Sequence, residues 1–294
     1  MNFKTKRYFF LCFLPFLFHQ CFSQDSSACN SSCIKKLAVV ETSVFTASSV
    51  GLYYAWYRPY AIEKFHFFND FPEWNQMDKA GHIFTAYQLG NTGYRALRHC
   101  KVSEKKALLY GAPLGFVYLL PVEIMDGFSS GWGFSFSDII ANTAGTALFT
   151  VQQLAFDKQI VQLKMSFHPS PYADYRPDLL GETLPEQILK DYNGQTYWLS
   201  FSPFGEKSKF SFLQISAGYG AEGMTGGREN SHPAEVSFPR YRQYYLSLDI
   251  NLSQIRTRKQ WLNKVLSTLS LIKIPFPAVE WNTTRQIRWH WIYF

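Results

Sequence analysis

Three short polar clusters carry the residues of this sequence that could do chemistry. Asp78 and His82 stand four residues apart with Lys79 beside them, so on a helix the first two share one face. Two later clusters place carboxylates and an amide one helical turn apart in apolar surroundings: Glu123 and Asp126, then Asp138 and Asn142. Ionisable groups in burial-prone segments need partners, so we expect the three clusters to meet in one polar centre.

Two interpretations of this polar centre compete. In the structural one, Asp78 and Asp138 cap helices. His82 then pairs with Glu123, and Asn142 satisfies backbone groups across the helices. In the functional one, a divalent cation or a polar headgroup is bound by one imidazole and three carboxylates: His82, Glu123, Asp126 and Asp138. The sequence shows no Ser-His-Asp order, Gly-rich phosphate loop or thiol centre that would identify a nucleophile.

Four helices are predicted to position these clusters. Apolar residues, caps and breaks place them at Lys35–Tyr57, Asp78–His99, Glu104–Met125 and Ser137–Asp157. Pro113 and Pro121 should kink the third helix, and Ser137 should cap the fourth. Short connections between four helices predict a bundle. Apolar stretches of near-spanning length favour a bundle that is embedded in or docked on a membrane over a free soluble one.

After Phe167 the sequence pattern changes from helical to a linker followed by strands. A Pro-containing linker at 168–194 precedes a β-rich region at 195–294, with strands predicted at Gln195–Phe201, Phe210–Ala221, Tyr241–Ile255 and Ile287–Phe294. One amphipathic helix is predicted at Arg258–Leu271. The aromatic last strand resembles the closing strand of an outer-membrane barrel, but such barrels need about eight strands, which favours a small sheet packed on the helices or on a membrane. The predicted fold class is α+β, with a four-helix bundle at 25–167 and a small antiparallel β-rich region after the linker.

The N-terminus follows the pattern of a secretory signal peptide over residues 1–24. A short basic region precedes an apolar run too short to span a bilayer, and Cys21 and Ser23 offer small residues at the cleavage positions. Acylation of Cys21 is the alternative, although Gln20 is bulky where lipoprotein sites have a small residue. Removing the segment takes away three basic and no acidic residues, so the formal charge falls from +7 to +4. This mild excess forms no Lys/Arg block, and nucleic acid is not an expected partner.

Three of the five cysteines follow the signal peptide. Cys29 and Cys33 predict either a local disulfide or two free thiols, because export permits oxidation. Cys100 is then left unpaired. The aromatic content of 18% suits dense cores and also membrane interfaces, where amphipathic rings collect.

The order of the polar motifs resembles a known family. Asp78-Lys79-x-x-His82, Glu123-x-x-Asp126-Gly127 and Ser137-Asp138-x-x-x-Asn142-x-x-Gly145 resemble the YfiM-like family of predicted periplasmic lipoproteins, over about residues 50–157. More distantly they are similar to VanZ-like membrane proteins. Those proteins have Gln in place of Asp126, and an Arg where this chain has Gly131-Trp132-Gly133. The resemblance implies a helical, VanZ-like domain in the cell envelope without an assigned activity.

These observations predict an exported, membrane-associated protein on the periplasmic side of the envelope, at the outer membrane. Its role would be structural, or the binding of a lipid or envelope component at the polar centre, with a protein partner through the β-rich region. The alternative is a metal-dependent envelope hydrolase or transferase acting on a lipid-linked or cell-wall substrate. In that alternative His82 is the base or a ligand, and a divalent metal is the one cofactor expected.

Overall fold

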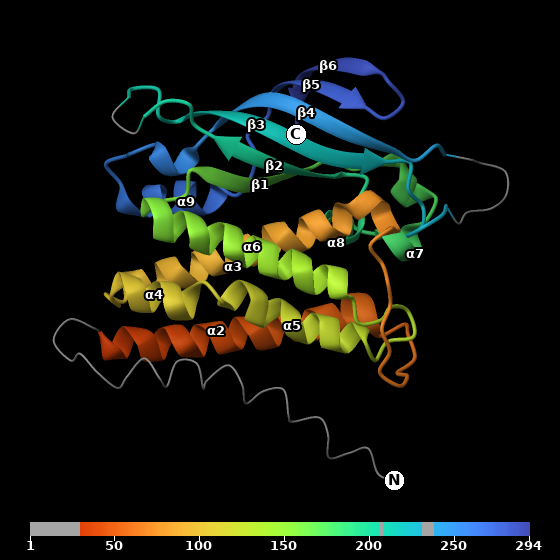
Figure 1. The fold of residues 1–294 in the computed structure, drawn as a ribbon, viewed down its shortest axis with the longest axis horizontal. Coiled ribbons are helices and arrows are strands. Elements are labelled where there is room, and N and C mark those ends of the chain that lie inside the picture. Colours follow the sequence, from red (N-terminus) through yellow and green to blue (C-terminus); the bar gives the residue numbers. More distant parts are fainter. Residues whose placement is uncertain (1–29, 206–207, 231–237) are drawn as a thin grey trace, which may run out of the picture. The chain divides into compact units, whose positions relative to one another are not determined.

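The computed structural model describes residues 30–205, 208–230 and 238–294 and divides into two compact units (Figure 1). Residues up to Asn69 together with Thr85–Ala155 form the first, which we call the helical unit. Asp70–Phe84 together with Phe156–Phe294 form the second, the sheet unit. The predicted signal peptide, with Cys21, and Cys29 lie outside the described residues.

The helices of the helical unit follow the predicted ranges closely. They are α2 (Ser31–Leu52) with a π-helical turn (Tyr53–Tyr57), α3 (Met77–His99, from Thr85 on), α4 (Glu104–Gly111), α5 (Leu114–Asp126) and α6 (Phe136–Phe156). The predicted third helix is divided at Pro113, since proline lacks an N–H and clashes with the preceding turn, whereas Pro121 lies inside α5. Ser135, not Ser137, caps α6, because the Asp138 amide donates to Ser135 Oγ at 3.1 Å.

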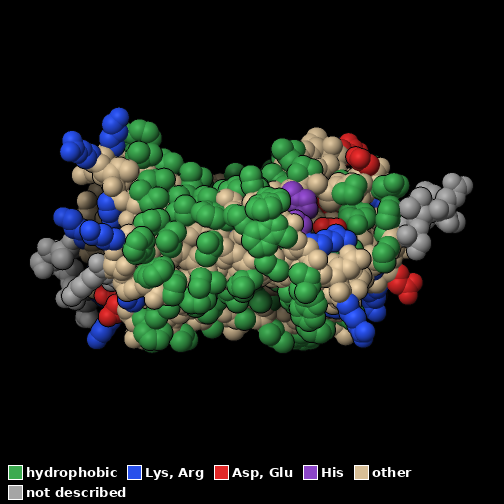
Figure 2. Space-filling model, turned by 90° about the horizontal axis from the view of Figure 1, so that it is seen from above, with side chains coloured by type: hydrophobic (Ala, Val, Ile, Leu, Met, Phe, Trp, Pro, Cys, Tyr) green, Lys and Arg blue, Asp and Glu red, His purple; other side chains and the backbone are tan. Residues whose placement is uncertain are grey.

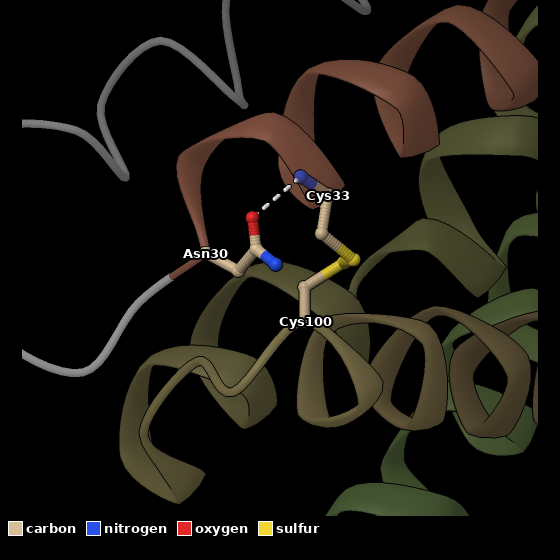
Figure 3. The surroundings of a disulfide bond; sticks show 3 residues. All are labelled: Asn30, Cys33 and Cys100. Atoms are coloured by element: carbon tan, nitrogen blue, oxygen red, sulfur yellow. Dashed lines mark hydrogen bonds between the residues drawn. A yellow bond between two sulfur atoms is a disulfide. The ribbon is translucent and has the colours of Figure 1, made fainter.

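A buried apolar cluster and a disulfide hold the helical unit together. The cluster consists of Ile34, Leu97, Cys100, Val102, Ala107 and Leu114. Cys33 is bonded to Cys100 with a Cα–Cα distance of 5.4 Å, and the Cys33 amide donates to Asn30 Oδ1 at 3.1 Å (Figure 3). The predicted pairing of Cys33 with Cys29 is therefore wrong, and Cys100 is not left unpaired. Local spacing suggested Cys29, whereas the packing of α2 beside the end of α3 supplies a partner 67 residues away.

The helical unit also exposes apolar surface. Four valines of α2 are at least half exposed: Val39, Val40, Val44 and Val50. Among the described residues, the stretch Glu104–Asp126 is long and apolar enough to cross a membrane, judged by length and composition. The helical unit thus leaves part of its apolar surface outside its buried core.

Six antiparallel strands, neighbouring one another in chain order, form the sheet. They are β1 (Val161–Phe167), β2 (Gln195–Phe201), β3 (Leu213–Glu222), β4 (Tyr241–Ile250), β5 (Phe276–Asn282) and β6 (Ile287–Tyr293). The predicted mixture of helices and an antiparallel sheet is confirmed, but β1, at the end of the range 25–167 assigned to the helical bundle, was not predicted as a strand, and neither was β5. β5 contains Pro277, which lacks a ladder N–H and is tolerated here because the pairing with β6 is irregular between Phe276 and Ala278.

Short helices lie between the strands. The predicted linker contains α7 (Pro177–Leu180) and α8 (Leu184–Lys190), and the predicted amphipathic helix is α9 (Gln260–Leu269), between β4 and β5. The residues after α9 pair with the outer edge of β1: the Met165 amide donates to the Leu271 carbonyl, and the Lys273 amide to the Met165 carbonyl, both at 3.0 Å. This covers part of an edge that would otherwise present unpaired backbone groups.

The sheet curls strongly, so that strands far apart in its order meet across its concave face. Thr196 Oγ1 in β2 lies 2.9 Å from Tyr293 Oη in β6. The rings of Trp198, Tyr245 and Tyr293, from three different strands, form one buried cluster with Ala278. Side chains of the sheet itself therefore fill much of its concave side.

The concave face is largely polar and the convex face is apolar. Buried polar side chains of the concave face include Lys164, Ser200, Ser216, Gln243, Asp249 and Glu280. Directly paired residues form apolar rows on the convex face: Leu199, Ala217, Leu246, Val279 and Trp289, and next to it Tyr244, Trp281 and Ile287. The large side chains of these rows are between 37% and 76% exposed. At one corner this face is covered by the start of α3, where Tyr197 and Tyr219 pack against the buried cluster of Met77, Ala221 and Met224. A sheet that faces water with its polar side would cover the remaining apolar rows as well.

Candidate functional site

The first predicted cluster lies in the sheet unit, at the start of α3. Lys79 Nζ lies 2.8 Å from Asp70 Oδ2 and 2.8 Å from Asp78 Oδ2. His82 Nε2 lies 3.5 Å from Asp78 Oδ1, and Tyr192 Oη donates to the same oxygen at 2.6 Å. The ion-paired side chains are no more than 19% exposed, so these charges interact at short range with little solvent between them.

Electrostatics keep the Asp78 carboxyl ionised. Burial alone would raise its pKa, but His82 and then Lys79 hold that pKa well below the ordinary value for an aspartate. A buried carboxylate with several donors around it is what an ion-pair network requires. The geometry within this unit therefore agrees with a bracing role for Asp78.

Strained backbone precedes the cluster and is held by the sheet. Trp74, Asn75 and Gln76 have left-handed φ values of 49°, 49° and 62°. Each of these left-handed conformations destabilises the fold by roughly 1–2 kcal/mol at a non-glycine residue, and it persists only when the surrounding structure enforces it. Tyr219 Oη donates to the Asn75 carbonyl, and Arg242 donates to the side-chain oxygen of Gln76. Strands β3 and β4 thereby determine where α3 begins, and with it the position of the cluster.

The other predicted residues lie in the helical unit. Asn142 Nδ2 lies 3.5 Å from Glu123 Oε1, and both side chains are fully buried. Asp126 Oδ1 accepts a hydrogen bond from Tyr57 Oη at 2.7 Å. Burial, and then the charge of Asp126, raise the pKa of Tyr57, so this phenol stays a proton donor. Asp138 is buried in the first turn of α6, where the helix dipole favours an anion.

The predicted polar centre is therefore described in two parts. Asp78, Lys79 and His82 belong to the sheet unit, and the residues of the two later motifs belong to the helical unit. That one cation is shared by His82, Glu123, Asp126 and Asp138 stays a prediction. Sequence reasoning missed the partners Tyr57 and Tyr192, which are single tyrosines remote in the chain and carry no spacing signal.

A pocket on the concave side of the sheet was not predicted. Its volume is about 340 Å³ and its lining includes His168, Glu222, Tyr245, Glu280, Arg288 and His290. Glu280 is 1% exposed and its Oε2 lies 2.8 Å from His290 Nε2. Asn282 Nδ2 donates to the other Glu280 oxygen at 3.0 Å. The lining thus offers a carboxylate, an imidazole and the guanidinium of Arg288, so it suits a small polar ligand.

One signal could have found this pocket. In β5 the polar residues Glu280 and Asn282 alternate with the apolar residues Val279 and Trp281. This alternation is typical of a strand with one buried face, but no strand was predicted here, because Pro277 argues against one. Here the polar face is the buried one, and it supplies the pocket.

Comparison with known proteins places part of this chain in context. Residues 67–153 match the family described as "Predicted periplasmic lipoprotein (DUF2279)". The match covers less than a third of the chain, contains every residue of the predicted polar centre, and ends before β1. It supports an exported protein of the periplasmic side of the cell envelope. No curated protein and no solved structure matches the chain.

Proposed function

We propose that this protein is an exported, membrane-associated protein of the cell envelope that docks on a lipid bilayer through the convex face of its sheet. The observation that carries the proposal is the inverted alternation of the strands. Leu246, Val279 and Trp289 lie side by side on the exposed face, while Asp249 and Glu280 are buried on the other. Strands that face lipid have this pattern, with apolar side chains outward and polar ones inward.

The energetics of the exposed face support a lipid partner. Burying apolar surface contributes roughly 25 cal/mol per Å², so rows of exposed leucine, valine and tryptophan favour an apolar cover. Three tryptophans at the β5–β6 edge, Trp281, Trp289 and Trp291, are 55%, 55% and 78% exposed. Tryptophan collects at membrane–water interfaces because its ring is amphipathic. Hydrophobic side chains also gather over much of the face of the molecule that Figure 2 shows.

The concave interior supports the same proposal. Lys164 Nζ lies 2.6 Å from Asp249 Oδ2, and both side chains are fully buried. Ser200 Oγ donates to the same carboxylate oxygen at 3.2 Å. An ion pair inside the sheet and apolar residues outside it are the reverse of a water-soluble sheet, in which the apolar face forms the core.

The proposal also includes the location of the protein, its partner and the role of the polar clusters. We place the protein at the outer membrane, with membrane lipid as its partner and a bracing role for the polar clusters. The order of the three motifs supports a YfiM-like and VanZ-like interpretation of the helical unit, with four helices as a bundle. The exposed valines of α2 are a further apolar surface that a membrane would cover.

Vesicle flotation tests the docking proposal. All samples carry Cys21→Ser, so that no acyl group on this residue contributes to binding. We expect the parent chain to float with phosphatidylcholine vesicles, and the variant Leu246→Gln/Trp289→Gln to bind at least tenfold more weakly. A matched control, Leu184→Gln/Leu189→Gln, changes two exposed leucines of α8 and should bind like the parent.

Two results would contradict docking through the sheet. One is a parent chain that stays in the aqueous fraction. The other is an equal loss of binding in the sheet variant and the α8 control, with both retaining the parent's circular dichroism spectrum. Self-association that the sheet variant abolishes in the absence of vesicles would identify a second copy of the chain as the cover of this face.

The metal-dependent hydrolase or transferase remains the alternative, because one imidazole and three carboxylates are also a ligand set for a divalent metal. Elemental analysis of the purified chain, beside the variant His82→Ala/Asp138→Asn, tests it. Under the bracing role we expect no stoichiometric metal in either sample and a lower unfolding midpoint for the variant. One equivalent of a divalent metal that is lost in the variant would favour the enzyme.

A further inference from the structure

The connection between β4 and β5 carries charges of a single sign. From Asn251 to Pro275 the chain has no acidic residue, and four basic side chains are exposed: Arg256, Arg258, Lys259 and Lys264. None of these four forms an ion pair with another residue in the described ranges. The fifth basic residue of the segment, Lys273, is buried in the sheet unit. The segment therefore presents uncompensated positive charge to its surroundings.

Helix α9, within this connection, exposes half of its apolar face. Trp261, Val265 and Leu269 follow one another at intervals of four residues and are 62%, 42% and 42% exposed. Leu262 and Leu266, on the adjoining side of the helix, are partly buried. The helix thus keeps one apolar stripe partly buried and presents a second stripe outward. A basic amphipathic helix with an exposed tryptophan is typical of segments that lie in a membrane interface.

The register places this connection at one end of the apolar convex face. β4 ends at Ile250, which pairs with Leu213 at the start of β3, and β5 begins at Phe276, which pairs with Tyr293 at the end of β6. Phe201, at the end of β2, is 42% exposed at the same end of the sheet. The basic segment therefore borders the surface that docks on lipid in the proposed function.

We propose that the segment Ile255–Leu269 recognises the anionic headgroups of phospholipids at the bilayer surface. This inference rests on the proposed docking of the sheet, which brings the segment to the membrane. The stripe of Trp261, Val265 and Leu269 enters the interfacial layer, and the four basic side chains meet lipid phosphates. Arginine contacts phosphate with a bidentate fork, and each basic side chain near an anionic surface strengthens binding roughly fivefold at physiological ionic strength.

Flotation with two vesicle compositions tests the inference. One set is phosphatidylcholine, and the other is an equal mixture of phosphatidylcholine and phosphatidylglycerol. The parent chain should prefer the anionic vesicles by roughly several hundredfold, and the preference should fall as salt is added, because salt screens surface charge. The variant Arg256→Gln/Arg258→Gln/Lys259→Gln/Lys264→Gln should lose this preference and keep its binding to neutral vesicles.

A control with the same change in net charge separates recognition from overall charge. The variant Lys35→Gln/Lys36→Gln/Lys101→Gln/Lys105→Gln removes four exposed basic residues of the helical unit and should keep the anionic preference. A parent chain that binds both vesicles equally, or two variants that lose the preference equally, overturns the inference while docking stands. A parent chain that binds neither vesicle overturns the proposed docking itself. Circular dichroism of each variant establishes that it is folded.

Discussion

The two units place their apolar residues in opposite ways. In the helical unit, Ile34, Leu97 and Leu114 form a buried core, and the disulfide between Cys33 and Cys100 lies against it. In the sheet unit, the buried side of the strands holds an ion pair, and leucines and tryptophans lie outside. The first arrangement is explained by burial in the fold itself. The second is not, which is why the sheet is the better guide to what this protein contacts.

The largest effect should come from breaking the ion pair inside the sheet. Lys164→Met leaves Asp249 buried without its cation, so we expect the free energy of unfolding in urea to fall by about 3–5 kcal/mol. The double variant Lys164→Met/Asp249→Leu should recover part of this loss, because the ion pair is then replaced by apolar side chains, while the buried Lys273 loses the attraction of Asp249. Lys209→Met, at an exposed position, should change stability little. If Lys164→Met lowered the free energy of unfolding as little as Lys209→Met does, the concave interior would have to be hydrated.

The disulfide of the helical unit should contribute slightly less to the free energy of unfolding than the ion pair inside the sheet. Replacing both Cys33 and Cys100 by serine opens a link between residues 67 positions apart, and we expect a loss of about 2–5 kcal/mol. Cys29→Ser is the matched control and should leave stability unchanged. Equal destabilisation by Cys29→Ser would contradict the Cys33–Cys100 pairing. Hydrogen exchange should locate the loss in α2 and α3 rather than in the strands.

A half-buried acid in α2 should make the helical unit sensitive to pH. Burial raises the pKa of Glu41 to about 7, above its value in the unfolded chain. Below about pH 4.5 both states are protonated and Glu41 has no net effect. As the pH rises to 7 the unfolded state ionises first, so the fold loses roughly 1–3 kcal/mol by pH 7 and above.

Glu41→Gln removes this titration. We expect the variant to match the parent at pH 4 and to be more stable at pH 8, as measured by thermal unfolding at each pH. Glu104→Gln, a change of the same kind in the first turn of α4, is the control for overall charge. A gain for Glu41→Gln that is equal at both pH values would contradict a raised pKa of Glu41.

The smallest effect should come from the convex face of the sheet. Leu246 is 58% exposed, so Leu246→Ala should lower the free energy of unfolding by about 0.5 kcal/mol or less in water. Leu109→Ala, at a leucine of α4 that is 64% exposed, gives the matching value for the helical unit. A loss of several kcal/mol for Leu246→Ala would show that this face belongs to a core, and would remove the contrast between the units.

Much of the local structure was predictable from short-range patterns. The range of α3 was predicted to within one residue and that of β2 without error, because periodicity and flanking breaks are local properties. The disulfide was not predictable from spacing, since Cys33 finds its partner only when α2 packs beside α3. β5 was missed because Pro277 argues against a strand, and a pairing irregularity that accommodates it is not visible in the sequence.

The candidate residues divide in the same way. The sequence by itself determined that Asp78 and His82 share one face of a helix, with Lys79 beside them, because i and i+4 positions lie together on any α-helix. It also determined that the strands alternate between polar and apolar residues. Only the tertiary structure decided that Tyr192 donates to Asp78 and that the polar side of the sheet is the buried one. Alternation with a period of two shows that a strand has a polar and an apolar face, but not which of the two is buried. The curl of the sheet, seen in contacts between remote strands, decides which face is exposed.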